Sequence, residues 1–280
     1  YFLEHNVLLR RFTLSVGVLA NYNSALNEGI HFYPGIDASY RIGDNFRLYG
    51  SWNRALRMPT FTDLYYEGKT NKGNPDLKPE ESEAFEVGLK YNTYFLRAHI
   101  AGFYRKGKNM IDWVKEKPED IWESQNLTKV DNLGFETNLS LLPRELGNER
   151  FFIRKIELGY AFIHQDKDSE GYISNYALDY LKHKFTAQLS HSIWKGFSAT
   201  WYVRWQDRAG SYTKYENLKP AYEEPYAPYC LVDMKVNWEY QRLNLYAELN
   251  NLLNSTYYDL GNIPQPGIWF KAGFRYSFKY

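Results

Sequence analysis

The C-terminal stretch IWFKAGFRYSFKY (268–280) decides how the rest of the chain is interpreted. Apolar or aromatic side chains occupy every second position from Ile268 to Tyr280, and the positions between them are mostly polar, as at Lys271 and Arg275. Successive side chains of a β-strand point to opposite faces, so this alternation predicts a strand with one apolar and one polar face.

The same alternation recurs upstream, and it predicts an all-β chain. About twelve segments show it, each roughly 10 residues long, which suits a tilted transmembrane strand. They lie near 12–21, 30–41, 45–55, 82–91, 94–106, 126–141, 153–165, 182–194, 197–208, 229–240, 242–253 and 268–280, and 1–7 is the end of one more.

The connections between these segments alternate in length. Short turns are expected at 8–11, 42–45, 92–93, 142–150, 195–196 and 241, and long loops at 22–29, 56–81, 107–125, 166–181, 209–228 and 254–267. Antiparallel strands joined in this way place all long loops at one end. Outer-membrane β-barrels have short periplasmic turns and long extracellular loops, whereas a soluble sandwich has no reason for this arrangement.

Charged residues at strand centres indicate which face is which. The polar faces carry both signs, as at Glu86, Arg97, Arg204 and Glu248. Such charges are costly in a small packed core but suit a watery or plugged lumen, so the apolar faces are expected to contact lipid. The 26 Tyr and 8 Trp then suit the aromatic girdles at the two membrane interfaces.

Composition excludes several other classes of protein. Among 280 residues, 34 Lys plus Arg against 33 Asp plus Glu leave a net charge of +1, which excludes a protein that binds a polyanion such as nucleic acid with its whole surface, and we expect no nucleic-acid partner. An aromatic content of 18% excludes disorder, and a single Cys excludes a disulfide framework or a thiolate zinc site. No apolar run is long enough for a transmembrane helix.

Catalytic, metal and cofactor patterns are weak. His183 and His191 have no third partner nearby in the sequence, and the adjacent pairs 80–81 and 223–224 of glutamates point apart on an extended chain. Nucleophile-elbow, phosphate-loop and dinucleotide motifs are absent from the sequence. We therefore expect no enzyme, no metal and no cofactor.

The C-terminal strand also resembles the outer-membrane assembly signal, a polar-x-Gly-x-x-aromatic-x-aromatic pattern at a chain end. The matching residues are Lys271, Gly273, Tyr276, Phe278 and Tyr280. The resemblance implies recognition by the barrel-assembly machinery and a periplasmic Tyr280. A chance match by an amphipathic edge strand is the alternative.

The stretch LRMPTFTDLYY (56–66), followed by GNPDLKPE (73–80), resembles TonB-dependent outer-membrane receptors. The residues that carry the resemblance are Arg57, Pro59, Asn74, Pro75, Leu77, Pro79 and Glu80. It implies a barrel of about 22 strands around an N-terminal plug, of which residues 1–280 are the C-terminal part without the plug and about nine strands. On physical grounds alone, the three prolines rigidify a long loop and begin a strand.

The same resemblance implies partners and a location in the outer membrane of a Gram-negative bacterium. The implied partners are the remaining barrel strands and the plug domain, TonB through the missing N-terminal part, the barrel-assembly machinery and outer-membrane lipid. A surface lipoprotein is a further candidate.

The ligand is a separate question. Residues 57–64 look most like cobalamin receptors of the Bacteroidetes type, and ferric-siderophore receptors share much of this pattern. Haem receptors typically carry a His between the two elements, and residues 60–74 contain none. Cobalamin or another corrinoid is the first hypothesis and a ferric siderophore the second. A soluble carbohydrate-binding or hydrolytic module and a plug-free porin are alternatives of other classes.

Aromatic residues of the expected long loops are the candidate ligand contacts: Tyr65, Tyr66, Trp122, Tyr212, Tyr215, Tyr257 and Tyr258. Flat rings with polar tips suit a large amphipathic ligand. In an extended stretch, one ring of the adjacent Tyr65 and Tyr66 would face the lumen and the other would not. The alternative for each residue is packing within a loop or a girdle.

Overall fold

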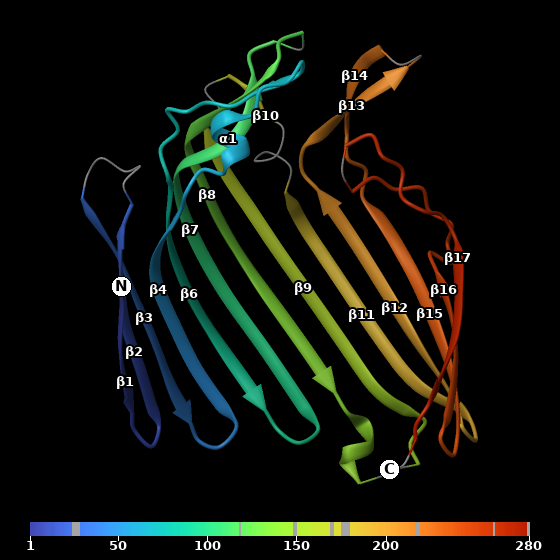
Figure 1. Cartoon of the computed structure of the whole chain (residues 1–280). Helices are drawn as coiled ribbons and strands as arrows, with labels where there is room; N and C mark the ends of the chain where they lie inside the picture. Colours follow the sequence, from blue (N-terminus) through green and yellow to red (C-terminus); the bar gives the residue numbers. More distant parts are fainter. Residues whose placement is uncertain are drawn as a thin grey trace. The chain divides into compact units, whose positions relative to one another are not determined.

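The computed structural model describes residues 1–23, 29–117, 119–147, 150–168, 171–174, 180–216, 219–259 and 261–278 (Figure 1). The chain forms two compact units. Unit 1 contains Tyr1–Lys90, Ile100–Phe135 and Ile163–Tyr180, and unit 2 contains Tyr91–His99, Glu136–Phe162 and Leu181–Tyr280.

Strands dominate unit 1. They are β1 (Phe2–Leu8), β2 (Phe12–Tyr22), β3 (Ile30–Ile42), β4 (Phe46–Arg57), β5 (Asn71–Lys72), most of β6 (Glu80–Asn92), the larger parts of β7 (Leu96–Lys115) and β8 (Trp122–Leu141), and β10 (Ile173–Ser174). Helix α1 (Phe61–Tyr65) follows β4. In Figure 1, α1 and β10 lie at the end of these strands opposite the turns that join β1 to β2 and β3 to β4.

Unit 2 is built in the same way. It contains most of β9 (Ile153–Asp168), then β11 (Leu181–Trp194), β12 (Phe197–Arg208), β13 (Ser211–Glu216), β14 (Lys219–Pro225), β15 (Tyr229–Tyr240), β16 (Leu243–Asn250) and β17 (Trp269–Tyr276), with a 3-10 turn at Pro143–Leu146. The β13–β14 hairpin and the turn between β15 and β16 lie at opposite ends of the strands (Figure 1).

Each long strand is hydrogen-bonded to the next long strand in the sequence, in the order β1-β2-β3-β4-β6-β7-β8-β9-β11-β12-β15-β16-β17. The long-strand pairs whose register is known are antiparallel. Short β5 pairs in parallel with β8, and β13 and β14 form a separate sheet. Within the described residues, β1 pairs with β2 alone and β17 with β16 alone, so both are edge strands.

The predicted antiparallel all-β fold is confirmed. All twelve predicted strands are present, with bounds within a few residues of those expected except at the end of β7, and 1–7 corresponds to β1. None of the helices in the described residues is long and apolar enough to cross a membrane.

Several predicted loops contain regular structure. Loop 56–81 contains α1 and β5, and loop 166–181 contains β10 and the end of β9. Residues 107–125 were expected as a loop, but β7 continues to Lys115 and β8 begins at Trp122. Backbone pairing therefore continues where the apolar alternation has already ended. There β7 carries three successive buried residues, Asp112, Trp113 and Val114, and Ser124 on β8 is also buried. Residues 209–228 contain the β13–β14 hairpin. The predicted loops 22–29 and 166–181 lie partly outside the described residues.

The apolar faces of the strands are exposed, as a lipid-facing surface requires. Phe185 and Leu189 on β11 are each 37% exposed, and Phe270 and Phe274 on edge strand β17 are 62% and 73% exposed. Few large apolar side chains are buried in the described residues, so a soluble packed core is not what holds these strands together.

Two glycines make room for tyrosine rings on neighbouring strands. A Cβ atom at Gly273 would lie 2.6 Å from Cζ of Tyr246, and one at Gly88 would lie 2.5 Å from Cζ of Tyr49. A lysine amine covers each ring: Nζ of Lys235 lies 4.5 Å from the ring centroid of Tyr246, and Nζ of Lys90 lies 4.6 Å from that of Tyr49. A side chain at either position would therefore have to displace a tyrosine ring, which favours glycine there.

The remaining residues of the expected assembly signal lie on or after β17. Nζ of Lys271 is 3.0 Å from a carboxylate oxygen of Glu248, and the rings of Tyr276 and Phe278 meet edge to face at 4.9 Å. Tyr280 lies outside the described residues. Recognition of these residues by the assembly machinery stays a prediction.

Candidate functional site

The segment after β4 begins with a capped helix. Oγ1 of Thr60 accepts a hydrogen bond from the backbone N–H of Asp63 at 3.1 Å, and Oδ2 of Asp63 accepts one from the backbone N–H of Thr60 at 3.0 Å. This capping box begins α1 and ends the extended conformation. The extended geometry expected for both residues is therefore wrong for Tyr65, which is the last residue of α1, whereas the C-cap Tyr66 has an extended backbone.

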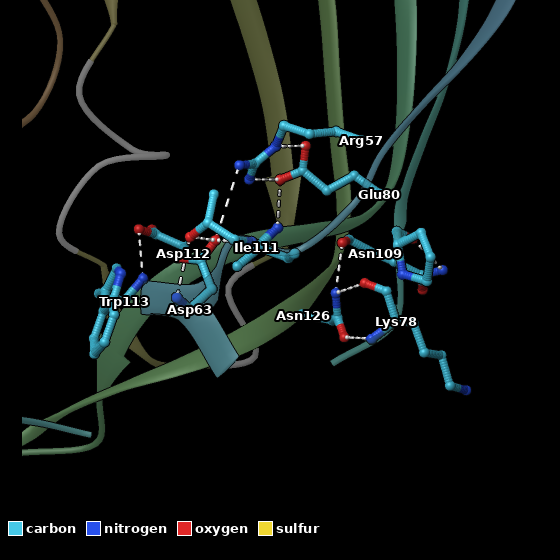
Figure 2. Close-up of polar contacts among 11 residues, drawn as sticks. Arg57, Asp63, Lys78, Glu80, Asn109, Ile111, Asp112, Trp113 and Asn126 are labelled. Carbon is cyan, nitrogen blue, oxygen red and sulfur yellow. Dashed lines mark hydrogen bonds and ion pairs between the residues drawn. The ribbon is translucent and has the colours of Figure 1, made fainter. Parts of the chain in front are cut away.

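Arg57 and Glu80 form a forked ion pair. Nε of Arg57 donates to Oε2 of Glu80 at 2.6 Å, and its second nitrogen donates to Oε1 at 2.5 Å (Figure 2). Oε1 also accepts from the backbone N–H of Ile111 on β7 at 2.8 Å. Glu80 is only 6% exposed, so its charge needs these donors. The pair joins the end of β4 to the start of β6.

Asn126 on β8 also holds the chain at the start of β6, through hydrogen bonds to the residues just before it. Its Nδ2 donates to the carbonyl oxygens of Lys78 at 2.9 Å and Asn109 at 2.7 Å, and its Oδ1 accepts from the N–H of Lys78 at 2.8 Å (Figure 2). Asn109 has a φ of 53°, in the left-handed region, where this bridge forms. One amide side chain therefore holds the chain just before β6.

Two further buried polar residues complete what we call the anchor cluster: Arg57, Asp63, Glu80, Asp112, Ser124 and Asn126. The hydroxyl of fully buried Ser124 donates to the carbonyl oxygen of Asp63. Asp112, 1% exposed, accepts from the N–H of Trp113 at 2.8 Å and from the hydroxyl of Ser174. The cluster thus ties α1 to β8 and β10 to β7.

The other motif residues support the shape of the loop. The N–H of Asn74 donates to the carbonyl oxygen of Asp63 at 2.9 Å, and Leu77 is buried. Oδ1 of Asn74 accepts from the N–H of Asp76 at 2.9 Å, which turns the chain at Pro75. Pro59 precedes the helix cap and Pro79 precedes Glu80. These contacts favour a loop-shaping role for the motif.

Sequence reasoning missed Asp112, Ser124 and Asn126. Each lies in a strand region where β-strand alternation says nothing about which polar residue is buried. Asp63 lies within the quoted motif. Thr60 precedes it by three residues, and this capping-box spacing could have predicted α1.

The candidate aromatic residues of unit 1 differ in exposure. Tyr65 is 62% exposed, and its ring centroid lies 5.6 Å from that of Phe61, which is 83% exposed. Tyr66 packs edge to face on Trp113 at 6.3 Å. Trp122 was expected in a loop but begins β8, where its ring lies under Nζ of Lys115 at 4.5 Å. Phe61 and Tyr65 therefore form an exposed aromatic pair on this loop.

In unit 2 the candidates divide into packed and open side chains. Tyr212, 6% exposed, stacks on Tyr258 at 5.0 Å and packs against Tyr226 at 5.2 Å. Tyr257 packs on Tyr229 at 4.6 Å. Tyr215 on the hairpin is 53% exposed. Tyr212 and Tyr258 therefore join the hairpin to the loop after β16, and Tyr215 stays open.

An ion pair stabilises the β13–β14 hairpin. Nζ of Lys214 donates to Oε2 of Glu224 at 2.6 Å, and the hydroxyl of Tyr212 donates to the same oxygen at 3.2 Å. The hydrogen bond from Lys214 lowers the pKa of Glu224 below its ordinary value. Burial raises the pKa of Tyr212, and its hydrogen bond to Glu224 acts in the same direction.

No group of three His, Cys, Asp or Glu side chains in the described residues is placed to hold a metal ion. The polar residues of the anchor cluster are committed to backbone and side-chain partners. The site's chemistry is therefore that of a shaped loop presenting aromatic faces.

Comparisons with known proteins support a single family. The family model described as TonB dependent receptor-like, beta-barrel matches residues 1–252. The Vitamin B12 transporter BtuB of Vibrio vulnificus is 26% identical over 217 residues, covering 58% of this chain and 35% of the transporter. The Ferrienterobactin receptor of Escherichia coli is 22% identical over 295 residues, covering 95% and 38%.

A solved structure agrees with this result at the level of the fold. The FrpB iron transporter from Neisseria meningitidis superimposes with a TM-score of 0.73 at 18% identity, over 99% of this chain and 44% of that one. The chain therefore spans less than half the length of these relatives.

Proposed function

The chain belongs to the family of TonB-dependent receptor-like β-barrels, and from that premise we propose that it is the C-terminal part of the barrel of a solute-uptake receptor. Its family and named relatives place it in the outer membrane of a Gram-negative bacterium. The observation that carries the proposal is the family match over residues 1–252, and the exposed apolar strand faces support it.

The whole receptor needs parts beyond residues 1–280. We propose a plug domain in the lumen, further strands against the free edges of β1 and β17, and TonB as the source of energy. Unpaired strand edges in lipid cost several kcal/mol for each unsatisfied group, which supports pairing of both edges. The barrel-assembly machinery, outer-membrane lipid and a surface lipoprotein are the other proposed partners.

Cobalamin or another corrinoid is the proposed ligand. A relative named as a vitamin B12 transporter supports it, and the open Phe61–Tyr65 pair offers flat aromatic surface to a large amphipathic ring. A ferric siderophore is the second candidate, because a relative named as a ferrienterobactin receptor matches 95% of the chain. Residues 60–74 contain no His, which disfavours haem.

We propose that the receptor moves its solute without changing it chemically. The named relatives are transporters and receptors, which supports this role over a hydrolytic module. Among the candidate contacts, we propose that Tyr65 and Tyr215 meet the ligand, and that Tyr66, Trp122, Tyr212, Tyr257 and Tyr258 shape the loops that carry them.

Ligand binding to the full-length receptor in detergent tests this proposal. Cyanocobalamin should bind with nanomolar-order affinity, and haemin and ferric enterobactin should not compete. Tyr65→Ala should weaken binding by about tenfold, a typical effect of losing an exposed aromatic anchor. Tyr94→Ala is the matched control, because Tyr94 is 68% exposed but lies in the short turn between β6 and β7.

The possible failures are distinct. Binding of ferric enterobactin without cyanocobalamin would replace the ligand and leave the receptor standing. If the protein binds neither compound, and small solutes still pass through it in cells that lack TonB, the result would favour a porin.

A further inference from the structure

Two cations are neighbours on the polar face of unit 2, near the end of the strands that carries the β13–β14 hairpin (Figure 1). Lys184 on β11 pairs in register with Gln206 on β12, so Arg204, two residues before Gln206, is its diagonal neighbour. Ser190 and Ser198 lie on the same face of these strands and line a cavity with mostly polar walls. Diagonal neighbours in a sheet are within reach of long side chains. We call Lys184 and Arg204 the cation pair.

The cation pair has no negatively charged partner in the part of the chain that the structure describes. Among the ion pairs of the described residues, none includes Lys184 or Arg204. Both side chains are half-buried. A charge that is partly removed from water is costly without a counter-ion, and two neighbouring like charges repel each other. An anion bound between the two side chains would remove both costs.

The nearby carboxylates have other partners. Asp233 on β15 accepts a hydrogen bond from the backbone N–H of Asn251 at 2.7 Å, and Asp259 in the loop after β16 accepts one from the hydroxyl of Tyr229. Neither carboxylate is within ion-pair distance of the cation pair, so the described residues supply no anion for it.

Aromatic rings surround the cation pair on the side of the long loops. Tyr202, two residues before Arg204 on the same face, is 41% exposed. Tyr229, the register partner of Gln206, packs at 4.6 Å against Tyr257, one of the candidate ligand contacts. A flat amphipathic ligand that meets these rings therefore brings its polar groups close to two positive charges.

We propose that Lys184 and Arg204 bind the phosphodiester of a complete corrinoid, the group that joins the nucleotide arm to the rest of the ligand. The inference rests on the proposed function and names the part of the ligand that this site recognises. The guanidinium of Arg204 can hold two phosphate oxygens through parallel hydrogen bonds, and the ammonium of Lys184 adds a point charge. The amide side chains of the corrin ring are uncharged, so the phosphodiester is the group that an unpaired cation pair selects.

Binding of two corrinoids to the full-length receptor in detergent tests the inference. Cyanocobalamin contains the phosphodiester, and dicyanocobinamide lacks it together with the nucleotide. In Lys184→Gln/Arg204→Gln the Kd of cyanocobalamin should rise about tenfold, the effect of losing charge-assisted hydrogen bonds, and the Kd of dicyanocobinamide should stay the same. Isothermal titration calorimetry measures both constants.

Arg242→Gln/Arg275→Gln is the matched control. It removes the same charge from the polar face of unit 2, but both arginines line the cavity that reaches the short β15–β16 turn. This variant should leave the Kd of both corrinoids unchanged.

Salt gives an independent measurement. Raising NaCl from about 0.1 M to about 1 M shortens the Debye length from about 10 Å to about 3 Å, and it should weaken binding of cyanocobalamin to the wild type more than binding of dicyanocobinamide. If Lys184→Gln/Arg204→Gln does not fold, the salt series and two milder variants decide. Arg204→Lys keeps the charge but loses the fork, and Lys184→Gln removes one charge, so each should weaken cyanocobalamin binding alone.

Two results would overturn the inference and leave the receptor function standing. An equal loss of affinity for both corrinoids means that the cation pair shapes the site without binding the phosphodiester. Unchanged affinity for both means that the cation pair does not meet the ligand. If the wild type binds neither corrinoid, the proposed ligand itself is wrong and the inference falls with it, which the wild-type titration shows before any variant is compared.

Discussion

Glu80 is the residue whose surroundings explain most about the loop after β4. It is 6% exposed, and it accepts hydrogen bonds from both arms of the Arg57 guanidinium and from the N–H of Ile111. A buried carboxylate without donors would be costly, so the arginine and the glutamate must occur together.

Arg57→Ala should destabilise the full-length receptor by about 1–3 kcal/mol, because it leaves the buried carboxylate of Glu80 with one hydrogen-bond donor. The cost stays moderate because the Arg57 side chain is itself half exposed. Arg57→Lys should recover only part of this loss, because an ammonium cannot form the fork. Urea unfolding in detergent measures the change. Arg54→Ala is the matched control: its 3.5 Å pair with Glu81 is exposed on both sides and should contribute less than about 1 kcal/mol. Equal costs for the two variants would contradict the role assigned to Glu80.

The Lys214–Glu224 pair should make the β13–β14 hairpin sensitive to pH at two extremes. Hydrogen bonding lowers the pKa of Glu224 below 4.5 and raises the pKa of Lys214 above 10.5. The pair therefore stabilises the hairpin between about pH 4.5 and pH 10.5. This contribution is lost as the pH falls through the lowered pKa of Glu224, or as it rises through the raised pKa of Lys214. The carbon-13 shift of the Glu224 carboxylate measures the lower midpoint. Lys214→Met should move that midpoint upward, and an unchanged midpoint would contradict the pairing.

Among the elements, β17 and β16 are joined by more than backbone hydrogen bonds. The Tyr246 ring lies where a side chain at position 273 would be, and Nζ of Lys235 lies 4.5 Å from the centroid of that ring. The glycine of the expected assembly signal therefore has a structural reason within the sheet, independent of any recognition by other proteins.

Gly273→Ala should cost about 1–3 kcal/mol, because the Tyr246 ring has to leave its place. In a Tyr246→Ala background the same substitution should cost under about 0.5 kcal/mol, since the clash is gone. The folded fraction on heat-modifiability gels measures both. Gly102→Ala is the control, because its nearest contact would be 3.9 Å away. A cost that is the same in both backgrounds would mean that backbone freedom, not the ring, requires the glycine.

The sequence predicts an element well where one face meets lipid and the other does not. The long strands were predicted because residues such as Phe274 and Arg275 fall on opposite faces. The prediction fails where no apolar alternation marks the strand: the ends of β7 and β8 and the β13–β14 hairpin carry backbone pairing without it. It also fails for the anchor cluster, because Glu80 and Asn126 lie 46 residues apart and only the folded chain brings them to the same segment.

At the scale of the whole molecule, the alternation of short and long connections predicts which side each faces. Lys195 is exposed in the short β11–β12 turn, and Tyr215 is exposed on the hairpin at the other end of unit 2. In a Cys230→Ser background, a membrane-impermeant maleimide should label Tyr215→Cys on intact cells. Lys195→Cys should react only after the outer membrane is permeabilised. The reverse pattern would invert the assigned topology.

The free edges of β1 and β17 have a consequence for handling the protein. Each presents unpaired backbone groups along its length, so residues 1–280 expressed alone should associate edge to edge unless further strands are supplied.

The hairpin of β13 and β14 is a sheet of its own, and its strands pair only with each other within the described residues. Substitutions at its open positions other than the proposed ligand contact, such as Tyr222, leave the ladder of the long strands untouched. The sequence of the hairpin can therefore change without disturbing the long strands, as is typical of a variable surface epitope. Under attack by antibodies or bacteriophage, related strains should diverge fastest here, while Tyr212 and Tyr226, which fasten the hairpin from beneath, change little.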